Sequence, residues 1–267
     1  MTTDFKAKPV LEDKFWIVEE QGQKIGTLRK NEDKFVFSNE NGVKFYHNKK
    51  SILSDYGKDF FVAKIVKEIV KSGKDPVYFI NNYCRISHPL RGLIKFDTFP
   101  YQDDLLQDFN DFRFSVILKA RQLGISTITA AYIVWLILFH RDKNVMVLAT
   151  KFATAANLVK KVKAIMKNLP DWIRITDISI DNRTSFELSN GSQIKASSTS
   201  GDAGRSEALS LLVIDEAAFV EGLDELWTAL YPTLSTGGRC IALSTPNGVG
   251  NFFHKTWVGA EDGTNTF

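Results

Sequence analysis

The chain has little cysteine and little histidine, and it has no long hydrophobic run. Its two cysteines, Cys84 and Cys240, are too few and too far apart for a disulfide framework. The four histidines show no metal-ligand spacing, so we expect no protein-bound zinc. The apolar run Ile128 to Phe139 is shorter than a bilayer-spanning helix, and Met1 to Lys14 lacks the apolar centre of a signal peptide. We therefore expect no membrane partner.

An excess of charge of one sign is also absent. Of the 267 residues, 24% are charged and 44% are hydrophobic, and the formal net charge is +3. This composition predicts one large domain, or one with a small appendage. The small net charge neither requires nor excludes nucleic acid, because binding depends on where basic residues gather. One predicted helix carries four lysines, for which a solvated face is the simpler explanation and DNA contact a hypothesis: Lys160, Lys161, Lys163 and Lys167.

Two adjacent carboxylates after an apolar segment are the most informative feature present. Asp215 and Glu216 directly follow the run Leu209 to Ile214, which is typical of a buried strand. A buried strand alone does not explain two charges at its exit, because burying them without partners costs free energy. In metal-assisted phosphoryl transfer, the first acid can hold Mg²⁺ and the second can polarise water. We interpret the pair as a Walker B motif.

A phosphate-binding loop is expected upstream of such a motif. Phe114 to Leu118 is typical of a strand and Ile128 to Phe139 of a buried helix, with a turn between them. Backbone N–H groups and the helix dipole favour phosphate at such a helix start. Two positions depart from the pattern G-x-x-x-x-G-K-[ST], because Lys119 stands at the first glycine and Ile125 at the lysine. Taken alone, the loop is better explained as an ordinary strand-to-helix turn.

The order of elements favours the phosphate-binding interpretation. After the loop come a strand at 144–150, a helix at 153–169, the strand that ends in the acids, and a strand at 239–243. This alternation predicts an α/β fold with a mostly parallel sheet flanked by helices, which carries its ligands at the carboxyl ends of the strands. Ser244 and Thr245 close the last strand, so we expect their hydroxyls to point toward the nucleotide. The three residues that follow are typical of a turn.

The segment before this core differs in character. Short strand candidates alternate with turn signals, and Asn41-Gly42 is a good hairpin signal: the candidates are Phe15 to Glu19, Lys24 to Arg29, Lys34 to Phe37 and Val43 to Tyr46. We predict a small β-rich N-terminal appendage at residues 1–56 and a P-loop domain at residues 57–267. Apolar residues spaced three and four apart from Phe61 to Val70 predict a helix that ends near Gly73.

Four motifs occur in order along the chain: Phe99 to Gln102, Arg121 to Thr127, Val213 to Ala217 and Ser244 to Gly248. They resemble, respectively, the adenine-binding motif, phosphate-binding loop, Walker B motif and coupling motif of the large terminase subunits that package DNA into tailed-phage and herpesvirus-like capsids. The resemblance covers about Lys58 to about Trp257, and the joint occurrence is more specific than any single motif. It implies an ASCE-type P-loop NTPase fold.

The resemblance also implies roles for the loop. Some terminases place a lysine at the start of the loop, as Lys119 is here, so its ammonium would replace the phosphate contact that Ile125 lacks. A solvated charge at a strand end is the alternative. The residues expected to bind the nucleotide are Lys119, Arg121, Gln122, Leu123, Gly124, Ile125, Ser126, Thr127 and Asp215. Ser126 and Asp215 would hold Mg²⁺, and Glu216 would activate the attacking water.

Two residues near the first motif are candidates for holding adenine. The carboxamide of Gln102 can donate to one purine atom and accept from another, and Tyr101 could stack on the base. An ordinary amphipathic helix that continues through Leu105, Leu106 and Phe109 would explain both residues equally well.

Two arginines are alternative candidates for an arginine finger. Arg205 ends a loop of small residues that begins at Ser197, and a flexible connection is the plainest interpretation of that loop. Either Arg205 or Arg121 could be an arginine finger, acting within one subunit or across a ring interface. The resemblance also implies that Ser244 and Thr245 couple hydrolysis to DNA movement.

The implied function is Mg²⁺-dependent ATP hydrolysis that drives double-stranded viral DNA into a procapsid. The implied partners are DNA, the portal protein, the small terminase subunit and further copies of the chain in a pentameric ring, although the isolated domain could be a monomer. The implied location is the host cytoplasm, at the portal. Large terminases continue into an RNase H-like nuclease domain, for which this sequence has no room, so we expect no DNA cleavage. A helicase-like DNA-dependent ATPase and a non-catalytic nucleotide-binding scaffold are the alternatives.

Overall fold

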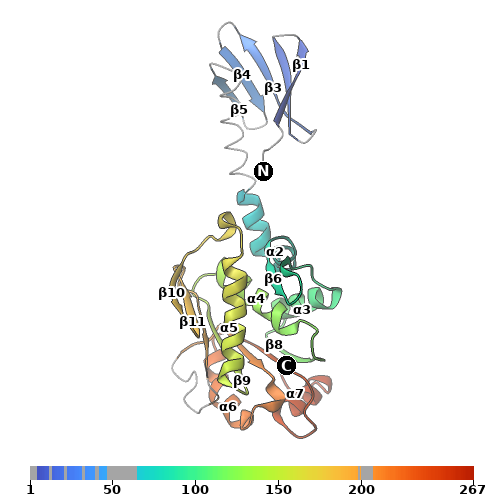
Figure 1. The fold of residues 1–267 in the computed structure, drawn as a ribbon, viewed down its shortest axis with the longest axis vertical. Coiled ribbons are helices and arrows are strands. Elements are labelled where there is room, and N and C mark those ends of the chain that lie inside the picture. The colour runs from blue at the N-terminus through green and yellow to red at the C-terminus, as the bar shows by residue number, and fades with distance from the viewer. Residues whose placement is uncertain are drawn as a thin grey trace. The chain divides into compact units, whose positions relative to one another are not determined.

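Two compact units make up the chain, Met1–Glu68 and Ile69–Phe267. The computed structural model, shown in Figure 1, describes residues 5–11, 14–20, 23–31, 34–39, 42–46, 65–197, 199 and 207–267. A helix over residues 65–74 agrees with the predicted helix, whose first residues lie outside the described ranges. The domain boundary predicted at residue 56 stays a prediction.

The first unit contains a small antiparallel sheet, as predicted. Its five strands follow one another in chain order: β1 (Phe5–Leu11), β2 (Phe15–Glu20), β3 (Gln23–Asn31), β4 (Lys34–Asn39) and β5 (Gly42–Tyr46). Trp16, Val18 and Leu28 are buried at alternate positions, which gives the sheet one apolar face. A Cβ at Gly26 would lie 2.5 Å from the ring of Phe37, so β3 accepts only glycine there. Strand β1 was not predicted.

The second unit is built on a seven-stranded, mostly parallel sheet. The strand order is β10-β11-β12-β9-β13-β14-β8, with β8 (Phe114–Leu118), β9 (Asn144–Ala149), β10 (Ile178–Asn182), β11 (Ser185–Leu188), β12 (Gln193–Ala196), β13 (Leu211–Asp215) and β14 (Arg239–Ser244). The five strands from β12 to β8 run parallel, and β10 and β11 extend the sheet antiparallel. The predicted α/β class and its four parallel strands are therefore confirmed.

Helices cover both faces of this sheet, because its central strands are apolar on both sides. Val147, Val213 and Ile241 pack into one cluster with α4 and α5, and Ile214 and Ala242 pack into a second with residues of α6 and α7. Figure 1 shows α4 and α5 running close together along the sheet. The labelled helices of this unit are α2 (Pro76–Tyr83), α3 (Pro100–Asp111), α4 (Ile125–Phe139), α5 (Phe152–Lys167), α6 (Leu223–Leu230) and α7 (Phe252–Glu261).

Helix α4 is the most buried helix of this unit. Twelve of its residues are buried, since it packs against the sheet on one side and against α2, α3 and α5 around the rest of its surface. Among the residues that the structure describes, no helix has both the length and the apolar character needed to cross a bilayer. Short 3₁₀ helices at η1 (Asp171–Ile173), η2 (Ala217–Phe219) and η3 (Tyr231–Leu234) complete the connections.

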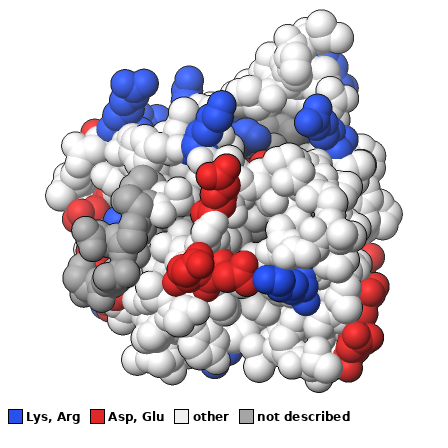
Figure 2. Space-filling view, turned by 90° about the horizontal axis from the view of Figure 1, so that it is seen from below, with Lys and Arg blue, Asp and Glu red and all other residues white. Residues whose placement is uncertain are grey.

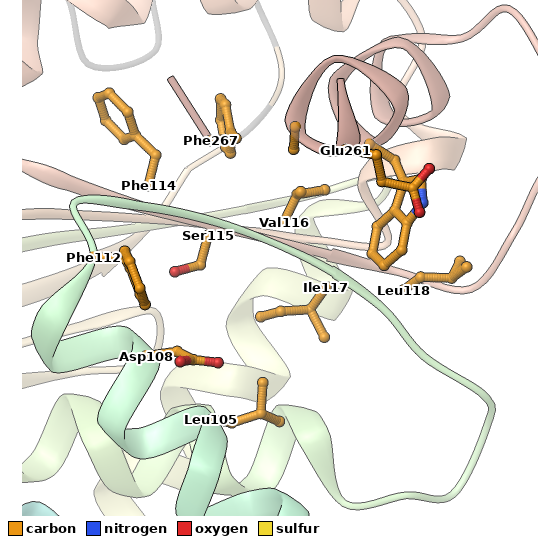
Figure 3. A pocket seen from close by; sticks show the side chains of 12 residues that line it. Leu105, Asp108, Phe112, Phe114, Ser115, Val116, Ile117, Leu118, Glu261 and Phe267 are labelled. Atoms are coloured by element: carbon orange, nitrogen blue, oxygen red, sulfur yellow. The ribbon is translucent and has the colours of Figure 1, made fainter. Parts of the chain in front are cut away.

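A largely apolar pocket lies along β8, the edge strand of the sheet. Figure 3 shows Phe112 and Leu105 on one side of it and Phe114 and Phe267 on another. Its volume is about 510 Å³, and α7 contributes Trp257 to the wall. None of the predicted site residues lines this pocket. The site predicted from the sequence therefore lies elsewhere in the unit.

Candidate functional site

The phosphate-binding loop is a tight turn between β8 and α4. Gln122 and Gly124 have φ angles of 67° and 72°, so the chain reverses through two left-handed positions before α4 begins. A Cβ at Gly124 would also lie 2.8 Å from Nε2 of Gln102. Both features favour glycine at this position. The first turn of α4, which contains Ser126 and Thr127, follows directly.

The acidic pair lies beside this loop. All five residues of β13 are buried, and Glu216 follows with a φ of 54°. The hydroxyl of Ser126 donates to Oδ2 of Asp215 over 3.1 Å. The sheet register explains the approach, because Ser244 pairs with Leu118 and Leu243 with Asp215, which brings the carboxyl ends of three strands to one edge. The loop and the acids thus converge as the sequence predicts.

Lys119 connects the two motifs directly. Its Nζ donates to Oε1 of Glu216 over 2.8 Å and lies 3.9 Å from Oδ1 of Asp215. The Lys119 side chain is only 9% exposed, so this is a sheltered ion pair and not the solvated strand-end charge considered as its alternative. The lysine at the start of the loop therefore reaches the site.

The two carboxyl groups differ in their electrostatic surroundings. Burial raises the pKa of Asp215 above its ordinary value, against the opposing effects of Lys119 and Ser126. Burial also acts to raise the pKa of Glu216, but Lys119 and Thr245 together bring it below the ordinary value. Glu216 is therefore held as a carboxylate with hydrogen-bond donors on both of its oxygens.

The two hydroxyl residues at the end of β14 point in different directions. The hydroxyl of Thr245 donates to Oε2 of Glu216 over 3.1 Å, and its backbone N–H approaches the same atom at 3.3 Å. Ser244 instead accepts from the N–H of Ala218 and donates to the carbonyl of Thr245. Its side chain is fully buried, so of these two hydroxyls that of Thr245 contacts the acidic pair and that of Ser244 does not. Their orientation toward a nucleotide stays a prediction.

The residues proposed for adenine lie in the first turn of α3. Gln102 is 2% exposed, and its carboxamide donates to the carbonyl of Leu123 over 3.0 Å and accepts from the N–H of Phe99 over 3.2 Å. The hydroxyl of Tyr101 donates to the same carbonyl over 2.9 Å, and its ring stacks on Phe99. Both side chains therefore tie α3 to the phosphate-binding loop.

A second pocket adjoins the loop on this side. It has a volume of about 550 Å³ and is lined by Phe99, Gln102, Gly124 and Thr127, together with residues from 86 to 97. Most of the latter belong to the hairpin β6 (Arg85–His88) and β7 (Gly92–Lys95), which was not predicted from the sequence, and two follow it, Phe96 and Asp97. The turn between its two four-residue strands, which ends at Gly92, was the available sequence signal for the hairpin. The φ of Gly92 is 66°.

The remaining candidates are two arginines and the lysines of α5. Arg121 is exposed in the loop, and Arg205 lies outside the residues that the structure describes. Of the α5 lysines, Lys163 and Lys167 both pair with Asp181 and do not form a free basic row. Figure 2 shows acidic side chains near the centre of one face and basic ones mainly toward its upper margin, so this face is not of one sign. DNA contact through α5 stays a hypothesis.

A parallel sheet with a phosphate-binding loop and an acidic pair at its carboxyl edge defines the P-loop NTPase fold class. Residues 116–265 match the family described as terminase large subunit, T4likevirus-type, N-terminal. The chain belongs to this family of terminase large subunits.

Two solved structures with TM-scores above 0.5 agree with this assignment at the level of the fold. The large terminase of bacteriophage HK97 is 16% identical with a TM-score of 0.56, over 72% of this chain and 41% of that one. The large terminase of a thermophilic bacteriophage is 11% identical with a TM-score of 0.51, over 62% of this chain and 43% of that one. The large terminase ATPase domain of Thermus phage P74-26 is 20% identical with a TM-score of 0.49, over 60% and 69%. The chain thus matches less than half of the length of the first two proteins.

Proposed function

We propose that this chain binds ATP with Mg²⁺ and hydrolyses it, and that hydrolysis drives double-stranded DNA into a viral procapsid. The observation that carries the proposal is the convergence of Lys119, Ser126, Asp215, Glu216 and Thr245 at one edge of the sheet. Cations and helix N–H groups there suit phosphate, and a partnered carboxylate suits the activation of water. Family membership supports the packaging role.

The residues present fit a magnesium ion. The Ser126 hydroxyl and the Asp215 carboxylate are hard oxygen donors 3.1 Å apart. Within the described ranges no cluster of three or more His, Cys, Asp or Glu could hold a metal alone. That donor set suits Mg²⁺, which keeps several waters and substrate phosphate oxygens as ligands. When bound, the ion would neutralise charge on the β and γ phosphates.

The protein's own groups divide the remaining tasks. The loop N–H groups and Lys119 would hold the phosphates, and Arg121 would contact the γ-phosphate or stabilise transition-state charge. Glu216 would orient a water and accept its proton, since its lowered pKa keeps it ionised at neutral pH. Thr245 would report the state of Glu216 to β14, because it donates to the same carboxylate.

The pocket beside the loop is the proposed site of the base. Phe99 and Gln102 line it, and Tyr101 stacks behind Phe99. Adenine could stack on the exposed ring of Phe99, while Gln102 would have to release its backbone partners to read the purine edge. The geometry therefore favours Phe99 over Tyr101 as the ring that meets the base.

The proposed partners follow from family membership. They are double-stranded DNA, the portal protein, the small terminase subunit and further copies of the chain in a pentameric ring on the portal, in the host cytoplasm. Arg205 or Arg121 would act as the arginine finger in that ring. We also propose that residues 1–267 do not cleave DNA by themselves, and incubation of plasmid with the chain and Mg²⁺ or Mn²⁺ tests this.

A steady-state phosphate-release assay tests the enzymatic proposal. The purified chain should hydrolyse ATP with added Mg²⁺ and stop when a chelator removes it. Glu216→Gln keeps the acceptor for Lys119 but removes the base, so hydrolysis should fall by about 10² to 10⁴ while ATP binding remains. Glu225→Gln on the surface of α6 is the matched control. Nucleotide binding without turnover by the unaltered chain would leave only the scaffold alternative.

A further inference from the structure

The position that holds a lysine in the standard phosphate-binding loop is closed to phosphate here. Ile125 is 4% exposed and packs into the apolar cluster beneath α4. Lys119 reaches the site from the start of the loop, but its Nζ lies between Glu216 and Asp215. A triphosphate carries several negative charges, so one lysine that two carboxylates already share is a poor match for it.

A second lysine approaches the same place from another helix. Nζ of Lys161, on α5, lies 3.4 Å from Oγ1 of Thr127, in the first turn of α4. The neighbouring residues of α5 fix this approach, because Leu158, Val162 and Ile165 are buried in the contact with the core. Lys161 stands at the edge of that buried face and keeps its contact with solvent. Its ammonium therefore lies beside the loop.

The electrostatic surroundings of Lys161 connect it to the site. Burial lowers the pKa of Lys161, Asp215 opposes that effect, and Lys119 adds to it. Two charged residues of the proposed site, Asp215 and Lys119, therefore interact electrostatically with Lys161. Among the described residues it has no carboxylate within ion-pair distance, whereas Lys163 and Lys167 on the same helix share Asp181. A cation held in this way, with a hydroxyl but no carboxylate as its partner among the described residues, suits an anion that arrives from solution.

We propose that Lys161 is a second phosphate-binding cation, which acts with Lys119 in place of the lysine that Ile125 replaces. The anion is the polyphosphate of the bound nucleoside triphosphate, so this inference rests on the function proposed above. In the nucleotide complex the Lys161 ammonium exchanges its contact with Thr127 for one with a phosphate oxygen. The exchange needs only rotation of a flexible side chain.

Equilibrium titration with fluorescent ATP and Mg²⁺ tests the proposal. Lys161→Met retains the stem and removes the charge, so the dissociation constant should rise by roughly 10-fold to 100-fold. Lys160→Met, at the exposed neighbouring position of the same helix, is the matched control and should bind like the unaltered chain. Lys161→Arg should recover most of the affinity. The unfolding temperature without nucleotide should be the same for all four proteins.

The outcomes separate this inference from the proposed function. If the unaltered chain binds ATP and Lys161→Met binds it equally well, the inference is overturned while the proposed function stands. It is also overturned if Lys161→Arg is as weak as Lys161→Met, or if Lys161→Met lowers the unfolding temperature without nucleotide. If the unaltered chain binds no ATP, the proposed function and the inference fail together.

Discussion

Nζ of Lys119 donates a hydrogen bond of 2.8 Å to Oε1 of Glu216, which joins the first residue of the phosphate-binding loop to the acid that directly follows β13. The other oxygen of the same carboxylate is held by Thr245, at the end of β14. Since β14 lies between β13 and β8, one carboxylate connects three neighbouring strand ends. We expect an arriving triphosphate to compete with Glu216 for Lys119, which would free Glu216 to bind water.

Replacing Lys119 with methionine should weaken nucleotide binding. The change removes a charge that lies between two carboxylates and beside the proposed phosphate position, so the affinity for ATP should fall by about 10-fold to 100-fold. Titration calorimetry with a non-hydrolysable ATP analogue measures it. Lys255→Met is a suitable control, because Lys255 is an exposed lysine that also pairs with an aspartate. Unchanged affinity in Lys119→Met would show that the loop-start lysine does not bind phosphate.

The pH dependence of hydrolysis should follow the partners of Glu216. The lowered pKa keeps the Glu216 carboxylate ionised. Its contribution to hydrolysis is therefore present above the ordinary pKa and is lost as the pH falls through the lowered pKa. Thr245→Val removes the hydroxyl donor, which should raise this pKa and move the acid limb of the kcat/KM profile to higher pH. Thr228→Val on the exposed surface of α6 is the control. An unmoved acid limb would mean that another group titrates there.

Gln102 should contribute to stability as well as to binding. Its buried carboxamide joins Phe99 to Leu123, so Gln102→Ala leaves the N–H of Phe99 without its partner and leaves the carbonyl of Leu123 with Tyr101 as its remaining side-chain donor. The free energy of unfolding should fall by about 1 to 3 kcal/mol, measured by urea titration, and the preference for ATP over GTP should also fall. Gln107→Ala, at an exposed position of the same helix, should change neither property. If only stability falls, Gln102 supports the loop without reading the base.

Local sequence patterns predicted the parts of the fold that carry a strong local signal. The apolar strands β13 and β14 give way to polar residues at Asp215 and Thr245. This change marks where each strand ends and where the candidate site lies. The loop around Gly124 was a weak signal alone because of Ile125, and the order of the strands and helices around it favoured the phosphate-binding interpretation. The sequence predicted only that these strands form a mostly parallel sheet. Their order was not predicted, because it depends on contacts between residues far apart in sequence.

The parts that were missed depend on tertiary packing. Lys161 was grouped with its neighbours on a helix surface, since nothing in its local pattern shows that α5 packs against the first turn of α4. The hydrogen bond between Ser244 and Ala218 was not predicted for a similar reason, because the N–H of Ala218 lies after the neighbouring strand β13. The hairpin that lines the second pocket consists of two strands of four residues each. Such strands are too short to show a clear alternation of apolar and polar residues.

A crystal structure with Mg²⁺ and a non-hydrolysable ATP analogue tests the central claim most directly. We predict triphosphate density over the turn from Lys119 to Thr127, the base in the pocket beside Phe99, and Nζ of Lys119 on a phosphate oxygen in place of Glu216. Nucleotide density elsewhere, with the hydrogen bond between Lys119 and Glu216 unchanged, would contradict the claim.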